Sequence, residues 1–435
     1  LADVRARTGL DAAKAWAAAI EERALAIGAL KDATLSARAD DMRDVGRRVL
    51  GGMLGVQSTT LPETPVIVLA RELSPSETAA FDPERVLGFC ITGGGPTSHI
   101  AILARAMGIP AIVSAKPSLL EIPEGTPVIL DGGQGTLDVN PGLEALNKAF
   151  EAQKAWQEGR RAAREQTALP TITTDGRRVE VAGNAGSTAN AVEAMKVSAD
   201  GIGLLRTEFL FLERTTAPSE DEQFEVYRTI AETMKPHPVI VRTLDIGGDK
   251  PVPYLDLPPE ENPFLGERGI RLCLNHPGLF KEQLRAILRA STHGHLKIMF
   301  PMVSEVGELR QAKVLIEELR AELGVPPVSV GIMVEVPSAA LLADSLAQEA
   351  DFFSIGTNDL TQYTLAMDRG NALLASRQDG LHPAVLRLIA LTVEGAHRHG
   401  KFVGVCGELG SDPLAVPILI GLGVDELSVS VPSIP

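Results

Sequence analysis

The second half of the chain alternates between short apolar runs and helix-length stretches, and this alternation constrains the fold more than any other feature. Eight strands, most of them followed by a helix, predict a (β/α)8 barrel, with an open doubly wound sheet as the alternative. Charged residues just past the strand ends favour the barrel, because barrel active sites lie at that end. The predicted strands are 179–182, 201–205, 239–244, 270–274, 297–302, 330–334, 352–355 and 402–405.

Three segments precede this barrel, which takes residues 170–435. Residues 1–57 are rich in alanine with apolar residues at helical spacing, which indicates part of a helical bundle. Residues 58–142 have short apolar runs between glycines and prolines, typical of the strands of a small mixed α/β domain. Residues 143–169 are polar and predict a connecting helix. The chain is therefore predicted to be a multidomain α/β protein.

Composition limits the function classes. The net charge of −15 argues against nonspecific binding of nucleic acid, although a few converging arginines can still bind a small anion. Cys90, Cys273 and Cys406 have no paired spacing, which fits a reducing compartment. No apolar run approaches the roughly 20 residues that span a bilayer, and no signal-peptide pattern opens the chain. A cytoplasmic protein without membrane insertion is the prediction.

A histidine lies in the first turn of a helix predicted after a glycine-rich loop. His99 ends the string Gly-Gly-Gly-Pro-Thr-Ser-His, and Gly108 and Pro110 end the helix. The positive end of the helix dipole disfavours imidazolium, which keeps the ring nucleophilic. The free N–H groups of the turn and the loop can hold a phosphoryl group. A lone histidine there is more often a helix cap or a surface residue, so the interpretation depends on the whole string.

Four arginines occur at or soon after predicted strand ends or in nearby loops. Any one of them alone is more often part of a surface salt bridge. Together they suit a trianionic substrate, because guanidinium groups match the geometry of phosphate and carboxylate. They are Arg206, Arg242, Arg268 and Arg369.

Two carboxylates and a cysteine follow other strands. Glu335 and Asp359 lie just beyond neighbouring strands and could bind Mg²⁺ together with substrate oxygens. The alternative is that both acids pair with the arginines. Cys406 ends the last predicted strand, where it is either core filling or, in a pocket that handles an enolate, the general acid.

These strings resemble enzyme I of the phosphoenolpyruvate (PEP):sugar phosphotransferase system. The segment around His99 is also similar to the phosphohistidine domain of PEP synthase and pyruvate phosphate dikinase. The resemblance implies that His99 becomes phosphorylated, with Thr97 bonding nearby, and that Cys406 protonates the enolpyruvate leaving group. It further implies Mg²⁺ bound by Glu335 and Asp359, and PEP bound by Arg206, Arg242, Arg268, Arg369 and Asn358.

The same resemblance implies transfer from PEP through His99 to a histidine phosphocarrier protein, as the first step of sugar uptake. Residues 1–57 would be an incomplete docking segment for that carrier, and the barrel would form a homodimer. Relatives normally extend beyond both ends, so the chain is expected to lack upstream sequence and a last barrel helix. The upstream part could hold a fused phosphocarrier, as in multiphosphoryl transfer proteins. A fragment of PEP synthase or dikinase, or an inactive regulatory scaffold, remain as alternatives.

Overall fold

The chain forms two compact units, residues 1–157 and 158–435, in a computed structural model. The structure describes residues 12–28, 42–43, 45–46, 49–50, 53, 64–71, 73, 81, 85–93, 104, 109–212, 214–247, 254–255, 257–258, 260–369, 371, 373–374 and 377–435. Each unit is described by itself. His99 and Thr97 lie outside the described residues, so their predicted placement stays a prediction.

The first unit begins with helix α2 (Ala12–Gly28), which confirms the helix predicted there. The indole N–H of Trp16 donates to the carbonyl of Gly46 at 2.8 Å. Glu21 and Arg43 form an ion pair at 2.9 Å. These contacts join α2 to the helical residues described between 42 and 53.

A small parallel sheet follows, in the order β1 (Val66–Ala70), β2 (Val86–Ile91) and β3 (Ala111–Ile112). It packs on a small core that includes Phe89, Ile91 and Ile109. An antiparallel pair, β4 (Val128–Asp131) and β5 (Thr136–Val139), comes next, before the long helix α6 (Leu143–Gln166). β5 was not predicted because its Thr-Leu-Asp-Val sequence is short and mostly exposed.

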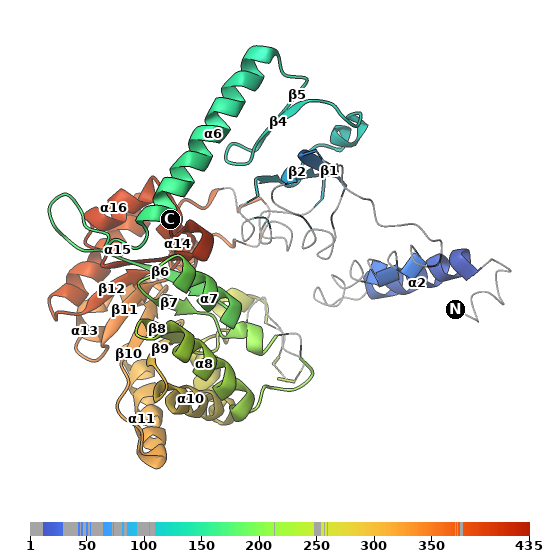
Figure 1. The fold of residues 1–435 in the computed structure, drawn as a ribbon. Coiled ribbons are helices and arrows are strands. Elements are labelled where there is room, and N and C mark those ends of the chain that lie inside the picture. The colour runs from blue at the N-terminus through green and yellow to red at the C-terminus, as the bar shows by residue number, and fades with distance from the viewer. Residues whose placement is uncertain are drawn as a thin grey trace. The chain divides into compact units, whose positions relative to one another are not determined.

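The second unit is a closed barrel of eight parallel strands, visible in Figure 1 with helices around it. It closes where the last strand pairs with the first, from Glu426 opposite Glu180 to Ser430 opposite Asn184. The predicted barrel is therefore confirmed, and the open sheet is wrong. The strands are β6 (Glu180–Ala185), β7 (Ile202–Leu205), β8 (Pro238–Arg242), β9 (His295–Phe300), β10 (Val330–Val334), β11 (Phe352–Ile355), β12 (Phe402–Val405) and β13 (Glu426–Ser430).

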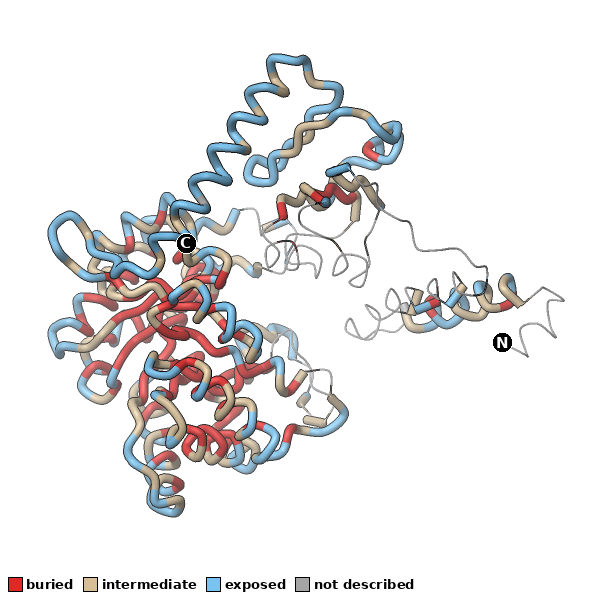
Figure 2. Tube along the Cα trace, viewed as in Figure 1, coloured by how far each residue is buried: buried red, intermediate tan, exposed pale blue. Residues whose placement is uncertain are grey.

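Helices pack around the strands, and Figure 2 shows the buried residues concentrated on the strands and on the inner faces of these helices. One core lies between strands and helices, and a second fills the barrel with side chains that include Leu204, Met299 and Met333. The helices of this unit after α6 are α7 (Thr188–Lys196), α8 (Glu220–Met234), α9 (Ile270–Asn275), α10 (Pro277–Ser291), α11 (Val306–Leu323), α12 (Pro337–Leu341), α13 (Ala343–Leu346), α14 (Thr357–Leu365), α15 (Pro383–His397) and α16 (Ala415–Gly421).

The strand predicted at 270–274 is wrong, because these residues form helix α9. A five-residue apolar run is too short for its periodicity to separate strand from helix. The helix buries Ile270, Leu272 and Cys273, while Arg271 pairs with Glu308 at 3.5 Å.

The eighth strand is instead β13, which lies beyond the predicted set. It lacks a continuous apolar run because two of its residues, Glu426 and Ser428, are polar, although both are buried within the barrel unit. The Ser428 hydroxyl donates to Asn184 at 2.7 Å. A side chain at Gly203 would come within 2.4 Å of a Glu426 oxygen, so glycine makes room for this carboxyl. Among the described residues, no helix is both long and apolar enough to cross a membrane.

Candidate active site

Most of the predicted site residues gather where the barrel strands end, as the sequence predicted. In a closed parallel barrel these ends form one face, which is where barrel active sites lie. Arg206 directly follows β7, and Arg242 is the last residue of β8. Glu335 directly follows β10, Asp359 lies in the first turn of the helix after β11, and Cys406 directly follows β12.

A continuous chain of ion pairs joins three of the four arginines. Arg242 lies 3.2 Å from Asp245, and Asp245 accepts two bonds of 3.1 Å from one nitrogen of Arg268. Arg268 also donates to Asp359 at 3.1 Å, and Asp359 lies 3.4 Å from Arg369. The arginines and acids therefore form one network. In this structure Asp359 pairs with arginines, which is the alternative to metal binding that the sequence left open.

The electrostatics of this network favour permanently charged guanidinium groups. Arg242 is 7% exposed and Arg268 3%, so neither is a surface salt-bridge residue. Burial alone would lower the pKa of each guanidinium. The surrounding carboxylates more than offset this effect and raise the pKa of both above the ordinary arginine value. The carboxylates are Glu208, Asp245 and Glu335 for Arg242, and Asp245, Asp359 and Glu335 for Arg268.

Arg206 differs from these two because its side chain is exposed to solvent. Protein atoms nevertheless surround it closely enough to disfavour its charge. This desolvation, followed by repulsion from Arg242, lowers the pKa of Arg206 below its ordinary value. Among the described residues, no carboxylate forms an ion pair with this guanidinium within 4 Å, so Arg206 offers an accessible positive charge at this face.

Arg268 and Arg369 share an aromatic neighbour. Each guanidinium carbon lies 5.9 Å from the centre of the Phe264 ring, within the range of a cation–π contact. The Tyr363 hydroxyl accepts from Arg268 at 3.3 Å, and the backbone N–H of Arg369 donates to Gln362 at 2.9 Å. Groups other than carboxylates thus also contact both arginines.

The two predicted metal ligands lie at the ends of paired strands, since β10 and β11 are hydrogen-bonded neighbours. Glu335 is 1% exposed and Asp359 6%. Burial, and then the charge of Asp359, raise the pKa of Glu335. One Glu335 oxygen accepts from the backbone N–H of Met302 at 2.7 Å. Met302 has φ +58°, a left-handed conformation that is uncommon outside glycine.

This donor set fits Mg²⁺, because Mg²⁺ is usually held by one or two carboxylates and completes its shell with water and substrate oxygens. A cation would also relieve the repulsion between the two buried acids. In the part of the chain that the structure describes, no group of three or more His, Cys, Asp or Glu side chains could hold a metal. Among these residue types, a site here would therefore depend on Glu335 and Asp359, with its other ligands being groups of another kind, such as water or substrate oxygens.

Cys406 is buried at the same face and keeps its proton. Desolvation raises the pKa of its thiol to about 11, and its sulfur donates to the Ile355 carbonyl at 3.7 Å. Asn184 donates to the Cys406 carbonyl at 3.1 Å. Asn358, in the first turn of α14, accepts from the backbone N–H of Glu408 at 3.0 Å, which ties the start of α14 to the segment after β12. A protonated thiol can act as a general acid.

Two acidic residues of the network were not predicted as site residues. Glu208 accepts a 2.6 Å bond from Arg242, and Asp245 lies between Arg242 and Arg268. Both are 3% exposed or less. The available signal was an acid two or three residues after an arginine at a strand end, at Arg206 and Arg242.

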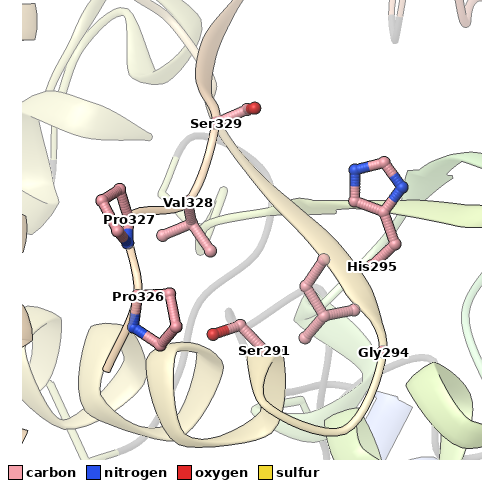
Figure 3. Close-up of a pocket in the computed structure, with 8 residues that line it drawn as sticks. Ser291, Gly294, His295, Pro326, Pro327, Val328 and Ser329 are labelled. Atoms are coloured by element: carbon pink, nitrogen blue, oxygen red, sulfur yellow. The ribbon is translucent and has the colours of Figure 1, made fainter. Parts of the chain in front are cut away.

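A separate pocket lies at the opposite end of the barrel. It is bordered by His295, at the start of β9, and by Pro326, Pro327 and Val328, which precede β10 (Figure 3). Burial, and then the charge of Lys297, lower the pKa of His295. No arginine, lysine, aspartate or glutamate lines this pocket, so it lacks the converging charges of the strand-end face and is not the candidate active site.

Known proteins match the chain along most of its length. The family described as "PEP-utilising enzyme, PEP-binding domain" matches residues 160–435, and "PEP-utilising enzyme, mobile domain" matches residues 62–135. A multiphosphoryl transfer protein of Rhodobacter capsulatus is 50% identical over 428 residues, covering 98% of this chain and 52% of that protein.

Shorter relatives match as well. A phosphoenolpyruvate-protein phosphotransferase of Geobacillus stearothermophilus is 49% identical over 415 residues, covering 93% of this chain and 72% of that protein. Its counterpart in Bacillus subtilis is 47% identical over 405 residues, covering 91% and 71%. The chain thus spans about half the length of the multiphosphoryl transfer protein and more of the phosphotransferases. These matches show that the chain belongs to the phosphoenolpyruvate-protein phosphotransferase family of PEP-utilising enzymes.

Proposed function

We propose that this chain transfers a phosphoryl group from PEP to its own His99 and then to a histidine phosphocarrier protein. The observation that carries the proposal is the network in which two buried arginines, Arg242 and Arg268, converge with Asp359 at the barrel face. Such a concentration of guanidinium groups suits the three negative charges of PEP. Relatives named phosphoenolpyruvate-protein phosphotransferase support the same substrate.

The arginines would orient PEP and neutralise its charge. Arg206 is accessible and would meet the substrate first, while Arg268 and Arg369 would release Asp359 as they take up phosphate and carboxylate oxygens. Asn358 would assist from the first turn of α14. Mg²⁺ bound by Glu335 and Asp359 would supply further neutralisation of the phosphate.

The chemical step would begin with the neutral imidazole of His99. A bond forms between a ring nitrogen and phosphorus as the bond between phosphorus and the enol oxygen breaks, and the electron pair leaves with enolpyruvate. The Cys406 thiol would give its proton to the methylene carbon and form pyruvate, and it would regain a proton from solvent. The raised pKa of Cys406 supports this role, because the thiol carries its proton at neutral pH.

The second transfer requires His99 to reach a different partner. Residues 58–142 would form the phosphohistidine domain, residues 143–169 and 56–62 its hinges, and residues 170–435 the PEP-binding barrel. Residues 1–57 would contribute to docking the phosphocarrier. We also propose that the barrel forms a homodimer and that the transfer serves sugar uptake.

Labelling without nucleotide tests the proposal. The protein is incubated with PEP carrying labelled phosphorus and with Mg²⁺, and acid-labile label on the protein is measured together with released pyruvate. We expect both products in equal amounts. Label that appears only when nucleotide is added would favour a synthase or dikinase, and binding without label or pyruvate would favour an inactive scaffold.

A further inference from the structure

We infer that Gln283 is a positioning residue that holds together the two strand ends bearing Arg206 and Arg242. It lies on α10, behind the site, and is 1% exposed. It touches none of the substrate-binding groups assigned above. The inference deepens the proposed function and rests on it, because it assigns the device that sets the spacing of the PEP-binding arginines.

The Gln283 amide bridges the two strand ends directly. Its nitrogen donates to the Thr207 hydroxyl at 3.2 Å, just after β7. Its oxygen accepts from the backbone N–H of Leu244 at 2.8 Å, just after β8. The nitrogen also donates to the Tyr227 hydroxyl at 3.2 Å. Both polar atoms of the amide are thus paired within a buried environment, and a fully paired buried network of this kind defines one geometry.

The contacts with Thr207 and Leu244 each lead on to the arginines of the site. The Thr207 hydroxyl donates to the carbonyl of Arg242 at 2.9 Å, so the end of β7 is bonded to the end of β8. Leu244 is followed by Asp245, the carboxylate that lies between Arg242 and Arg268. Gln283 therefore controls the position of Asp245 from one side and that of Arg242 from the other.

A second buried glutamine provides a matched control. Gln223 on α8 is 0% exposed and belongs to the same network, since it accepts from Tyr227 at 3.3 Å. Its nitrogen donates to the carbonyl of Pro218 at 3.1 Å. No described hydrogen bond joins it to either strand end. Loss of Gln223 should therefore weaken the core without changing the spacing of the arginines.

The test compares Gln283→Met with Gln223→Met in the full chain. Methionine has a similar length and cannot make the amide hydrogen bonds. Thermal unfolding measures the structural effect. Calorimetric titration with PEP and Mg²⁺ measures the dissociation constant, with every variant carried in a His99→Ala background so that PEP is bound but not consumed. Both variants should unfold at lower temperature. Only Gln283→Met should raise the dissociation constant, by about tenfold or more, because small misplacements of binding groups have large effects.

A second pair of variants serves if Gln283→Met does not fold. Thr207→Val removes the hydroxyl that joins Gln283 to Arg242, and Thr207→Ser keeps it. We expect weaker PEP binding for Thr207→Val and near-parental binding for Thr207→Ser. Equal binding by all variants, or equal losses for Gln283→Met and Gln223→Met, would overturn the positioning role. A parent protein that binds no PEP would instead refute the proposed function, and this inference with it.

Discussion

Replacing Asp245 by asparagine would remove the negative charge that lies between two buried arginines. Asp245 is 2% exposed, lies 3.2 Å from Arg242 and makes two 3.1 Å contacts with Arg268. Removing one partner of a buried ion pair costs about 3–5 kcal/mol. Asparagine keeps one acceptor oxygen, and each arginine keeps a second carboxylate, Glu208 or Asp359. We therefore expect the lower end, about 3 kcal/mol.

Chemical denaturation of the full chain, read at the transition of the barrel unit, measures this loss directly. In thermal unfolding, 1 kcal/mol shifts the melting temperature of a large domain by about 2 °C, so the expected decrease in melting temperature is about 6 °C. Asp221→Asn is the control, since Asp221 pairs with Arg289 at a similar 2.8 Å but is 81% exposed. Exposed pairs contribute about 0–1 kcal/mol. Equal stability of Asp245→Asn and the parent, or equal losses for both variants, would refute the reasoning.

Three further predictions concern single side chains of the barrel. Burial, and then the Glu180 carboxylate, raise the pKa of Glu426 to about 8, whereas an unfolded glutamate titrates near 4.3. The free energy of unfolding should thus fall as pH rises between these values. In urea unfolding, Glu426→Gln should flatten this dependence and have a larger free energy of unfolding than the parent at pH 8, and parallel pH profiles of the two proteins would contradict this. Cys406→Ala should still allow phosphoryl transfer to His99 but slow protonation of enolpyruvate, which NMR of the pyruvate formed in deuterated water measures. An unchanged rate and stereochemistry of deuterium incorporation at the methyl carbon would exclude Cys406 as the acid. Glu335→Gln or Asp359→Asn should abolish Mg²⁺-dependent turnover in a metal titration while circular dichroism stays parental, and a parental metal dependence would refute the two-carboxylate site.

The barrel could be predicted from the sequence because its strands are buried on both faces and form continuous apolar runs. The prediction failed at two places where this relation breaks down. α9 has an apolar run too short to show a helical period, and β13 carries the buried polar residues Glu426 and Ser428. In both cases the packing of neighbouring elements, and not the local sequence, determines the structure.

The sequence predicted the position of the arginines and acids at the strand ends but not which of them pair with one another. Spacing from a strand end indicates which face a side chain occupies, and this was sufficient for Arg242 and Glu335. It does not indicate which carboxylate an arginine contacts, so Glu208 and Asp245 were missed. Gln283 lies 39 residues from the backbone group that it binds, at Leu244, and no local pattern connects the two.

Mapping of the phosphorylated residue tests the central claim most directly. The protein is incubated with labelled PEP and Mg²⁺ in the absence of nucleotide, digested at a pH that preserves phosphohistidine, and its peptides are sequenced by mass spectrometry. The account predicts one phosphoryl group per chain, on His99, with one pyruvate released for each, and no label on a His99→Ala variant. Label on His237, His382 or another residue, or a labelled His99→Ala variant, would contradict the account.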